Sequence, residues 1–437
     1  MHMDNIKTTE ELLGFLKNSP TAFQAVEEIE KKLTEAGFAK LGEHENWDIV
    51  PGGKYFVTRN GSSVIAFSVP KEYAHSFMIT ASHTDSPTFK LKSAFEAEAC
   101  GKYVKLNVEG YGGMILSSWL DRPLSIAGRL IVKDGSKITT KNVNIDRDLV
   151  LIPNVAIHQN RQINSGFSYN IAVDMMPLYS ASDKKGTLLE TAAEYAGCAK
   201  ENVVGGDLYL YNRTPGTIWG AGDEFFSSAR IDNLQCAYST LIGFISAADE
   251  AKAVNVYASF DNEETGSSTK QGAGSQFLSD TLAKIAEKLG FSVTEALASS
   301  FMVSADNGHA KHPNHPELSD AQNSPAMNEG VVIKENAAQK YTTDAVSSAI
   351  FAKICEDANV PVQRFANRSD MGGGSTLGSI SNTNAAMITV DIGLAQLAMH
   401  SSYETAGTKD TGYMIDAITQ FYKSKLTTDG DGSYTIE

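Results

Sequence analysis

Four segments of the chain have the composition of short buried strands, and each is followed by an acid or a histidine. The four segments and the residues that follow them are Ser76–Ser82 with His83, Ala253–Phe260 with Asp261, Ser299–Ala305 with Asp306, and Ala386–Ile392 with His400. In open α/β sheets, ligands bind outside the carboxyl ends of the strands. Imidazoles and carboxylates brought repeatedly to that edge are the ligand types of a catalytic metal site. The pattern therefore predicts an α/β fold with a metal site at one edge of its sheet.

The size and composition of the chain are those of a multidomain globular protein. Its 437 residues exceed what one small core organises, so the length predicts two or three domains. Hydrophobic residues make up 42% of the chain and charged residues 20%, which is typical of globular proteins. The net charge of -15 argues against nucleic acid and against an anionic membrane surface as partners. No apolar run approaches the ~20 residues of a membrane-spanning helix, so we expect no membrane span.

The N-terminal segment and the cysteines bear on the compartment. Residues 1–7 lack the apolar stretch of a secretory signal. The cysteines are far apart and form no C-x-x-C pair; they are Cys100, Cys198, Cys236 and Cys355. This usage predicts buried or partly buried free thiols in a reducing compartment, and it argues against a cysteine-ligated zinc site. A cytoplasmic enzyme is expected.

The character of the sequence changes twice along the chain. Apolar residues that recur every three to four positions predict two N-terminal helices, over Thr8–Lys17 and Thr21–Gly37. From about residue 90 to residue 226 β-like segments dominate; they include Tyr103–Val108, Leu124–Lys133 and Leu149–Ala156. We therefore expect an α/β catalytic domain formed by residues 1–90 and 227–437, interrupted by a β-rich insertion of residues 91–226.

Helices and strands alternate again after the β-rich region. The helices predicted there are Asn233–Ala248, Ser275–Leu289, Thr343–Ala358 and Lys409–Lys425. The last segment, Thr427–Glu437, is polar and rich in glycine, so it is expected to extend beyond the core.

Two acidic patterns near the predicted strand ends suit catalysis. Asp85 lies two residues after His83, where a carboxylate can hold the imidazole in the tautomer that presents its other nitrogen to a metal. Glu263 and Glu264 are adjacent, so their side chains point in different directions. One of them can bind a metal while the other takes a proton from the attacking water. A solvated acidic loop is the alternative interpretation of this pair.

Two aspartates and a histidine cluster have two interpretations each. Asp232 stands at the predicted start of a helix, where it is either a cap or a bridge between two metal ions. Asp306 is equally suited to a turn or to metal binding. The close histidines are His309, His312 and His315. Two prolines between and after them prevent the helix that joint ligation needs, so we expect a loop that lines the site.

The motifs around these residues resemble those of a known family. In chain order they are His83-Thr-Asp85-Ser-Pro87, Leu151-Ile-Pro-Asn-Val-Ala-Ile-His158, Arg230-Ile-Asp232-Asn-Leu234, Asp261-Asn-Glu263-Glu264-Thr-Gly-Ser, Ser304-Ala-Asp306-Asn-Gly-His309-Ala and Met399-His400-Ser401. Together they resemble the M18 aminopeptidases, the aspartyl aminopeptidase family, over nearly the whole chain. The resemblance implies a zinc-peptidase-type three-layer α/β catalytic domain with a β-rich inserted dimerisation domain. It also implies a homo-oligomer built from dimers, commonly a dodecamer.

The resemblance implies roles for single residues. The implied metal ligands are His83 and Asp306 for one divalent ion, Glu264 and His400 for a second, and Asp232 for both. Glu263 matches the general base, and Asp85 matches the carboxylate that orients His83. His158 matches a histidine that reaches the active site of a neighbouring subunit and helps to stabilise the oxyanion. Zinc is the expected metal, with manganese or cobalt able to replace it.

The substrates implied are small peptides, with acidic N-terminal residues as a possible preference. Such a preference needs a cation near the substrate side chain, for which the candidates are Lys334, Lys340 and Arg368. The resemblance places the segment Asn367–Thr376 near the substrate, with Asp370 and Gly373 as binding residues. This segment contains Met-Gly-Gly-Gly where Pro-Cys-Gly is typical of the aspartyl-specific eukaryotic members, so strict specificity for aspartate is not implied. No G-K-[ST] follows its glycine run, which argues against a phosphate-binding loop.

The predicted function is a two-metal aminopeptidase. A related di-metal amidohydrolase, such as a deacetylase or dipeptidase, is the alternative within enzymes. A non-catalytic structural shell is the alternative outside them. A shell needs neither the metal ligands nor Glu263, so their presence argues against it.

Overall fold

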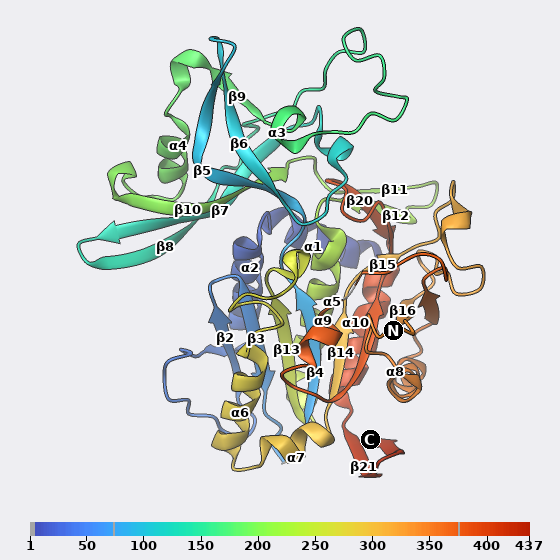
Figure 1. Ribbon diagram of the computed structural model, residues 1–437. Helices are drawn as coiled ribbons and strands as arrows, with labels where there is room; N and C mark the ends of the chain where they lie inside the picture. The colour runs from blue at the N-terminus through green and yellow to red at the C-terminus, as the bar shows by residue number, and fades with distance from the viewer. Residues whose placement is uncertain (1–4, 73–74, 375) are drawn as a thin grey trace.

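A nine-stranded mixed sheet forms the centre of the computed structural model, which describes residues 5–72, 75–374 and 376–437 (Figure 1). In sheet order its strands are β1 (Ala39–Lys40), β2 (Lys54–Arg59), β3 (Ser63–Ser68), β13 (Val254–Phe260), β4 (Phe77–His83), β14 (Phe301–Ala305), β18 (Ile388–Gly393), β16 (Val331–Glu335) and β17 (Val362–Ala366). The strands predicted to precede an acid or a histidine are β13, β4, β14 and β18, which are adjacent and parallel. Their carboxyl ends therefore meet at one edge of the sheet.

Helices cover both faces of this sheet. One face carries α1 (Asn5–Asn18), α2 (Ala22–Glu35), α5 (Ile231–Ala247), α8 (Ala345–Asp357) and α10 (Asp410–Lys423), and the other carries α6 (Phe277–Leu289), α7 (Val293–Ala298) and α9 (Leu377–Ser381). Residues of β13 alternate between the two cores: Tyr257 packs in the first, whereas Val256 and Ala258 pack in the second. This alternation is the two-residue period of a strand buried on both faces. The predicted α/β class, with three layers, is confirmed.

A second, antiparallel sheet is inserted in the chain between β4 and α5. In sheet order its strands are β8 (Lys137–Asn144), β7 (Leu124–Asp134), β10 (Val203–Asn212), β5 (Thr88–Ala99), β6 (Tyr103–Tyr111) and β9 (Leu178–Ala181). The helix α4 (Leu188–Tyr195) packs with it around a separate hydrophobic core that includes Phe89 and Trp119. This sheet lies above the carboxyl edge of the central strands in Figure 1.

The β-like pattern of Leu149–Ala156 does not form a regular strand. Only isolated bridges occur there, at Val150, Leu151 and Ile152. Pro153 follows them and has no N–H to continue a ladder. Residues 153–170 form a long loop, which projects at the top right of Figure 1.

The remaining strands form a five-stranded sheet and a hairpin. The sheet contains β11 (Thr217–Trp219), β12 (Phe225–Ser228), β20 (Glu404–Gly407), β19 (Ala395–Leu397) and β15 (Gly308–His309), and the hairpin contains β21 (Leu426–Gly430) and β22 (Ser433–Ile436). The prediction that the C-terminal segment extends beyond the core is wrong for part of it. Leu426 is buried in the core, and Tyr434 and Ile436 pack against it, because their apolar side chains alternate along the hairpin. The short helices are α3 (Ile171–Asp174), η1 (Leu116–Trp119), η2 (Ser182–Lys184), η3 (Lys200–Asn202), η4 (Ala248–Glu250), η5 (Glu263–Thr265) and η6 (Pro316–Leu318).

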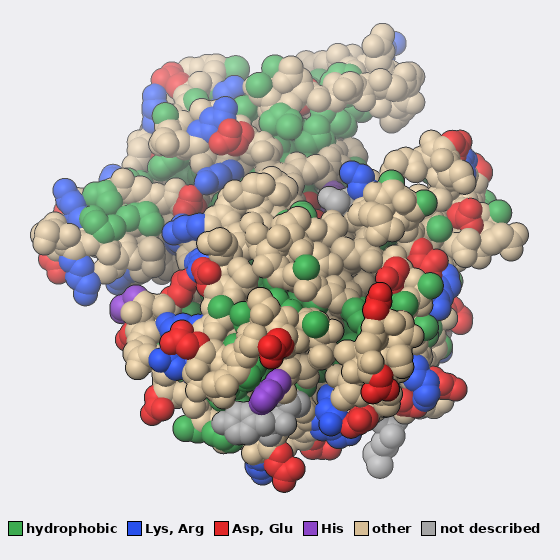
Figure 2. All heavy atoms as spheres, turned by 60° about the horizontal axis from the view of Figure 1, so that its bottom comes forward, with side chains coloured by type: hydrophobic (Ala, Val, Ile, Leu, Met, Phe, Trp, Pro, Cys, Tyr) green, Lys and Arg blue, Asp and Glu red, His purple; other side chains and the backbone are tan. Residues whose placement is uncertain are grey.

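The helices, cysteines and surface charges bear on where the protein is located. Among the described residues, no helix is long and apolar enough to cross a membrane. All four cysteines are free, but Cys100 is exposed, contrary to the prediction, because it lies in the turn between β5 and β6. Figure 2 turns the lower part of the molecule forward and shows acidic and basic side chains interspersed on that face. The cytoplasmic location stays a prediction.

Candidate metal centre

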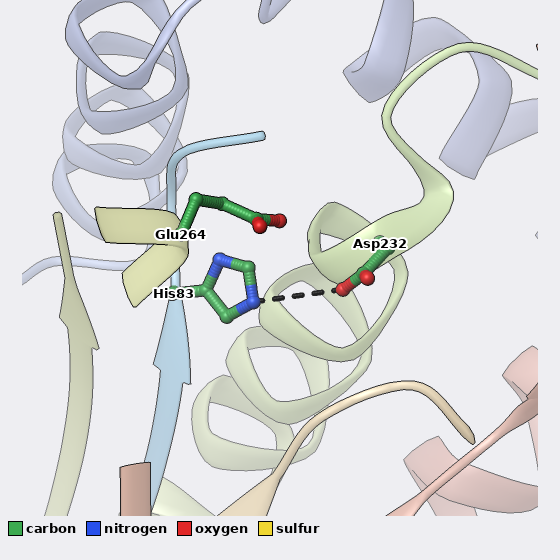
Figure 3. A group of neighbouring side chains, drawn as sticks. All are labelled: His83, Asp232 and Glu264. Atoms are coloured by element: carbon green, nitrogen blue, oxygen red, sulfur yellow. Dashed lines mark ion pairs between the residues drawn. The ribbon is translucent and has the colours of Figure 1, made fainter. Parts of the chain in front are cut away.

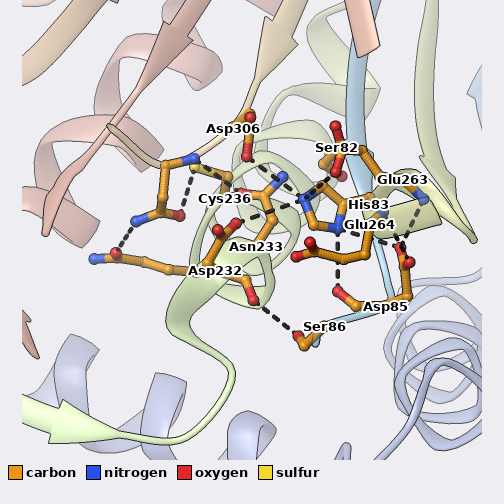
Figure 4. Close-up of polar contacts among 12 residues, drawn as sticks. Ser82, His83, Asp85, Ser86, Asp232, Asn233, Cys236, Glu263, Glu264 and Asp306 are labelled. Atoms are coloured by element: carbon orange, nitrogen blue, oxygen red, sulfur yellow. Dashed lines mark hydrogen bonds and ion pairs between the residues drawn. The ribbon is translucent and has the colours of Figure 1, made fainter. Parts of the chain in front are cut away.

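His83, the last residue of β4, lies at the middle of the predicted site. Its side chain is 1% exposed, and its Nε2 is 3.5 Å from Asp232 Oδ1 and 3.5 Å from Asp306 Oδ1. Glu263 Oε2 is 4.0 Å from the same nitrogen. The other ring nitrogen, Nδ1, is 3.1 Å from the backbone carbonyl oxygen of Asp85 and 3.3 Å from Asp85 Oδ1 (Figure 4). One side of the imidazole thus faces a carboxylate cluster, and the other side faces an orienting carboxylate.

His400 faces the same aspartate from the opposite side. Its Nε2 is 3.3 Å from Asp232 Oδ2 and 3.5 Å from Glu264 Oε2. Asp232 therefore directs one carboxylate oxygen to each of two imidazoles. Figure 3 shows Asp232, His83 and Glu264 converging from three separate elements.

The local backbone conformation positions these side chains. Arg230 has a left-handed conformation with φ 63, and the helix α5 is kinked at Asp232 and Asn233, which are joined by a cis peptide bond. The Asn233 side chain donates to the carbonyl of Ala305, 2.8 Å away, and so ties this helix start to the end of β14. Asn262, with φ 64, turns the chain after β13 so that the two glutamates face the site.

Two buried carboxylate oxygens at the centre accept no hydrogen bond from the described residues. Asp232 Oδ1 and Glu264 Oε1 are buried, and no hydrogen bond among the described residues reaches them. Burying a carboxylate oxygen that accepts no hydrogen bond is costly, and Asp232 Oδ1 has only the His83 ring nitrogen 3.5 Å away, so a cation is the partner that these atoms fit. His83, Asp232 and Glu264 each offer one ligand atom, and these atoms lie within 4.8 Å of one another. Imidazole nitrogens and carboxylate oxygens are ligands that zinc accepts. The residues therefore fit divalent metal ions.

The pKa values of the two glutamates are raised, whereas that of Asp232 is lowered. Burial raises the pKa of Glu263 to about 7; His83 opposes this rise and Asp306 adds to it. Burial also raises the pKa of Glu264 well above its usual value. Burial would raise the pKa of Asp232 as well, but His400 and His83 outweigh it and hold that pKa below its usual range. Of these three acids, Asp232 is thus the one whose surroundings favour the charged form.

Two residues of the site escaped the sequence analysis. Glu404 is 2% exposed, and its two carboxylate oxygens accept from the backbone N–H groups of Asp232 at 3.0 Å and His400 at 2.8 Å. Its spacing of four residues after His400 is the only local signal. Tyr111 donates to Asp85 Oδ2 at 2.7 Å, and it comes from β6 in the inserted sheet, so no local pattern connects it to the site.

The structure places the other candidates at different distances from this cluster. Lys334 is buried, and its Nζ lies 3.5 Å from Asp306 Oδ2. Burial would lower the pKa of Lys334, but Asp306 outweighs it and raises the pKa above its usual value. Asp370 is exposed and paired with Arg368 in the segment before α9, where Gly373 also lies.

The other candidate histidines, His158, His309, His312 and His315, lie on β15 and on loops. His309 ends β15, and the rings of His312 and His315 are 5.4 Å apart on the loop that follows. His158 is exposed on the loop of residues 153–170. In the part of the chain that the structure describes, no hydrogen bond or ion pair joins the His158 side chain to the cluster.

Comparisons with known proteins identify the family of the chain. The family model described as "Aminopeptidase I zinc metalloprotease (M18)" matches residues 15–422. A protein from Clostridium acetobutylicum, named a probable M18 family aminopeptidase 2, is 44% identical over 430 residues, which cover 96% of this chain and 99% of the relative.

Solved structures of related proteins have the same fold. Ape4 in a cryo-EM structure of its complex with Nbr1 superposes with a TM-score of 0.93 at 36% identity, covering 96% of this chain and 86% of that chain. The mApe1 dodecamer of S. cerevisiae gives a TM-score of 0.83 at 27% identity, covering 95% of this chain and 96% of that chain. The resemblance of the motifs is thereby confirmed: the chain belongs to the M18 family of zinc metalloproteases and is a metallo-aminopeptidase.

Proposed function

We propose that this metallo-aminopeptidase holds two divalent ions and removes the N-terminal residue from small peptides. The observation that carries the proposal is the position of Asp232, whose two oxygens face two different imidazoles. A carboxylate that binds a single ion needs no second imidazole on its other oxygen. A separate carboxylate accompanies each imidazole, Asp306 beside His83 and Glu264 beside His400.

The proposed ligand sets follow from these contacts. His83 and Asp306 would hold one ion, His400 and Glu264 the other, and Asp232 both. When bound, such a pair of ions lowers the pKa of a water and stabilises the charge that develops during attack on a carbonyl. Zinc is the metal proposed, since the family is one of zinc metalloproteases, and manganese or cobalt suits the same ligands.

Glu263 is the proposed general base. Its Oε2 lies 4.0 Å from His83 Nε2, beyond the carboxylates that face His83 more closely, so it borders the ligand cluster. A carboxylate in this position, beside the proposed ligands but not one of them, can accept a proton from water and then return it to the leaving amine. Asp85 would keep the His83 ring oriented through Nδ1.

The two-metal aminopeptidase is tested by hydrolysis of aminoacyl-p-nitroanilides carrying a range of N-terminal residues. We expect activity that a chelator abolishes and that about two equivalents of Zn²⁺ per subunit restore. N-acetylated versions of the same substrates are the control, because they lack the free α-amine. Hydrolysis of the acetylated substrates alone would favour the alternative amidohydrolase, and full activity at one equivalent of metal would contradict the two-metal site.

Lys334 is proposed to favour acidic N-terminal residues, because it is a buried cation beside Asp306. We expect Lys334→Met to lower kcat/KM for glutamyl and aspartyl substrates by roughly 10- to 100-fold more than for leucyl substrates, as expected when a hydrogen bond to a charged group is lost. The loss of its pairing with Asp306 affects all substrates alike, so the ratio is the measurement. Lys340→Met, at an exposed lysine six residues away, is the control. An equal decrease in kcat/KM for all substrates would show that Lys334 does not determine substrate specificity.

We also propose a homo-oligomer built from dimers, with a dodecamer as the full assembly and residues 91–226 as the dimerisation domain. The loop that carries His158 exposes apolar side chains that a partner would cover: Val155 is 50% exposed and Ile157 49%. Ape1 of S. cerevisiae, the relative with 27% identity, forms a dodecamer. His158 would then reach the active site of the partner and stabilise the oxyanion.

Subunit mixing tests the role of His158. His158→Ala and Glu263→Gln subunits are each expected to be inactive. Random co-assembly should restore about a quarter of the wild-type activity, because half of the dimers are mixed and each mixed dimer has one complete site. Co-purification through two different tags verifies mixing. No recovery in verified mixed oligomers would contradict action across the interface.

A further inference from the structure

The segment Tyr111–Gly113 leaves the inserted sheet and runs along the metal centre. Tyr111 is the last residue of β6, and its hydroxyl lies 2.7 Å from Asp85 Oδ2 and 2.8 Å from Asn262 Nδ2. Asp85 faces His83, and Asn262 immediately precedes Glu263. One hydroxyl from the second sheet therefore links the ends of two strands of the first.

The partners of Asn262 fix the direction of these hydrogen bonds. Its Oδ1 accepts from the Thr269 hydroxyl at 2.7 Å and from the Gln271 side chain at 2.6 Å. The amide nitrogen must therefore be the atom that faces Tyr111. Because that nitrogen donates, the Tyr111 hydroxyl accepts from Asn262 and gives its own proton to Asp85.

Asp85 connects the Tyr111 hydroxyl to the proposed metal ligands. Its Oδ1 accepts from the backbone N–H of Glu263 at 3.1 Å, and its Oδ2 accepts from that of Glu264 at 3.2 Å. The same carboxylate faces His83 Nδ1. The position of Asp85 thus sets the positions of a proposed ligand, His83, and of the turn that carries both glutamates.

The two glycines after Tyr111 contact the other half of the site. Gly112 has φ 72, and a Cβ added there would lie 3.0 Å from the Cβ of Glu264 and 3.4 Å from its Oε2. The carbonyl oxygen of Gly113 lies 2.5 Å from His400 Nδ1. A carbonyl can only accept, so Nδ1 carries the proton and Nε2 is free to face Asp232 and Glu264.

The inserted sheet holds this segment in place. Tyr111 pairs with Thr88 at the start of β5, three residues after Asp85. Its ring packs edge-on against Tyr209 of β10, with centroids 5.7 Å apart. Tyr111 is therefore held in the second sheet, Gly112 and Gly113 follow directly from it, and the contacts of all three residues belong to the metal centre.

We propose that Tyr111, Gly112 and Gly113 are positioning residues through which the inserted sheet sets the geometry of both halves of the metal site. The inference rests on the proposed two-metal function and extends it: the six-stranded sheet and the residues that follow it supply two outer partners of the site, Tyr111 beside Asp85 and Gly113 beside His400. Tyr111 acts through Asp85 on His83 and the glutamates. Gly113 acts on His400, and Gly112 leaves the space that Glu264 needs.

Tyr111→Phe tests the first half, with Tyr209→Phe as a matched control that removes a hydroxyl from the neighbouring ring. We expect Tyr111→Phe to weaken Zn²⁺ binding by roughly 10-fold in competition with a chromogenic chelator. This is the lower end of the range that loss of an outer partner costs, because Tyr111 contacts the outer partner Asp85 and not the ligand His83 itself. The rise in Tm on adding Zn²⁺ should shrink, while the Tm of the metal-free protein stays close to that of the wild type. We also expect kcat to fall with KM nearly unchanged. Wild-type Zn²⁺ affinity in Tyr111→Phe, or an equal loss in Tyr209→Phe, would overturn the role of Tyr111.

Gly112→Ala tests the role of the glycines, because the added methyl group would crowd Glu264. Its control is Gly101→Ala, at a glycine with a similar φ of 64 but with no atom within 4 Å of the added Cβ. Both variants carry the same backbone strain, so weaker Zn²⁺ binding and a changed Co²⁺ absorption spectrum are expected in Gly112→Ala alone. Equal behaviour of the two variants would overturn the role of the glycines. The wild type is titrated with Zn²⁺ first. Fewer than two bound ions in the wild type would overturn the proposed function, and this inference with it. Two ions bound with unchanged affinity in the wild type and in all four variants would overturn the inference only.

Discussion

Glu263→Gln is expected to lower kcat by roughly 10²- to 10⁴-fold while two metal ions stay bound per subunit, because loss of a general base removes a contribution of that size. Glutamine keeps the length and shape of the side chain but cannot accept the proton of water. Glu263 Oε2 stands 4.0 Å from His83 Nε2, whereas the oxygens of Asp232 and Asp306 stand 3.5 Å from it. The substitution therefore leaves the closer carboxylates in place.

The adjacent glutamate gives the matched comparison. Glu264 Oε2 faces His400 at 3.5 Å, and its other oxygen is buried without a partner among the described residues. We expect Glu264→Gln to release at least one ion, since it removes a ligand charge. Single-turnover kinetics and metal analysis of both variants separate the roles. A normal kcat in Glu263→Gln, or loss of metal from it, would refute its assignment as the base.

The central sheet could be predicted because its strands are short apolar runs that end in polar residues. The strand at Ala253–Phe260 was placed to within one residue, and the structure begins it at Val254. Full burial on both faces explains the continuous apolar run. The C-terminal helix begins at Asp410, one residue after its predicted start. The strand predicted over Leu149–Ala156 does not form, because Pro153 has no N–H to continue the ladder and only isolated bridges precede it.

The sequence predicts the candidate metal ligands of the site, but not the residues that hydrogen-bond to them from other strands. Strand ends brought His83 and Asp306 to one edge because parallel neighbours share a direction. Glu404 and Tyr111 reach the site only through the pairing of β20 with β12 and of β6 with β5, which no local pattern encodes. Asp370, Gly373 and His158 lie on loops, where the chain alone does not show what a substrate or a second subunit contacts. Their roles stay predictions.

Asp232→Asn is expected to weaken the binding of both metal ions, and by more than the roughly 10- to 100-fold that the loss of an outer partner costs. Among the described residues, the Asp232 carboxylate is the one that forms ion-pair contacts with both His83 and His400. An asparagine would turn an N–H₂ group toward one of these imidazoles and would carry no charge to offset two cations. Variants of Asp306 or Glu264 should weaken one ion more than the other, so a joint loss is the signature of a bridging residue.

Asp410→Asn is the matched control, because Asp410 is also a buried aspartate in the first turn of a helix. Its oxygens accept from the backbone N–H groups of Asn328 and Gly330, at 2.6 Å and 3.1 Å, and they do not face the metal cluster. We expect Asp410→Asn to lower stability but to bind two ions as tightly as the wild type. Zn²⁺ competition titrations and Tm values with and without metal report both effects. If Asp232→Asn lost a single ion and kept the other at wild-type affinity, Asp232 would be a ligand of one ion only, and the two-metal bridge would have to be assigned elsewhere.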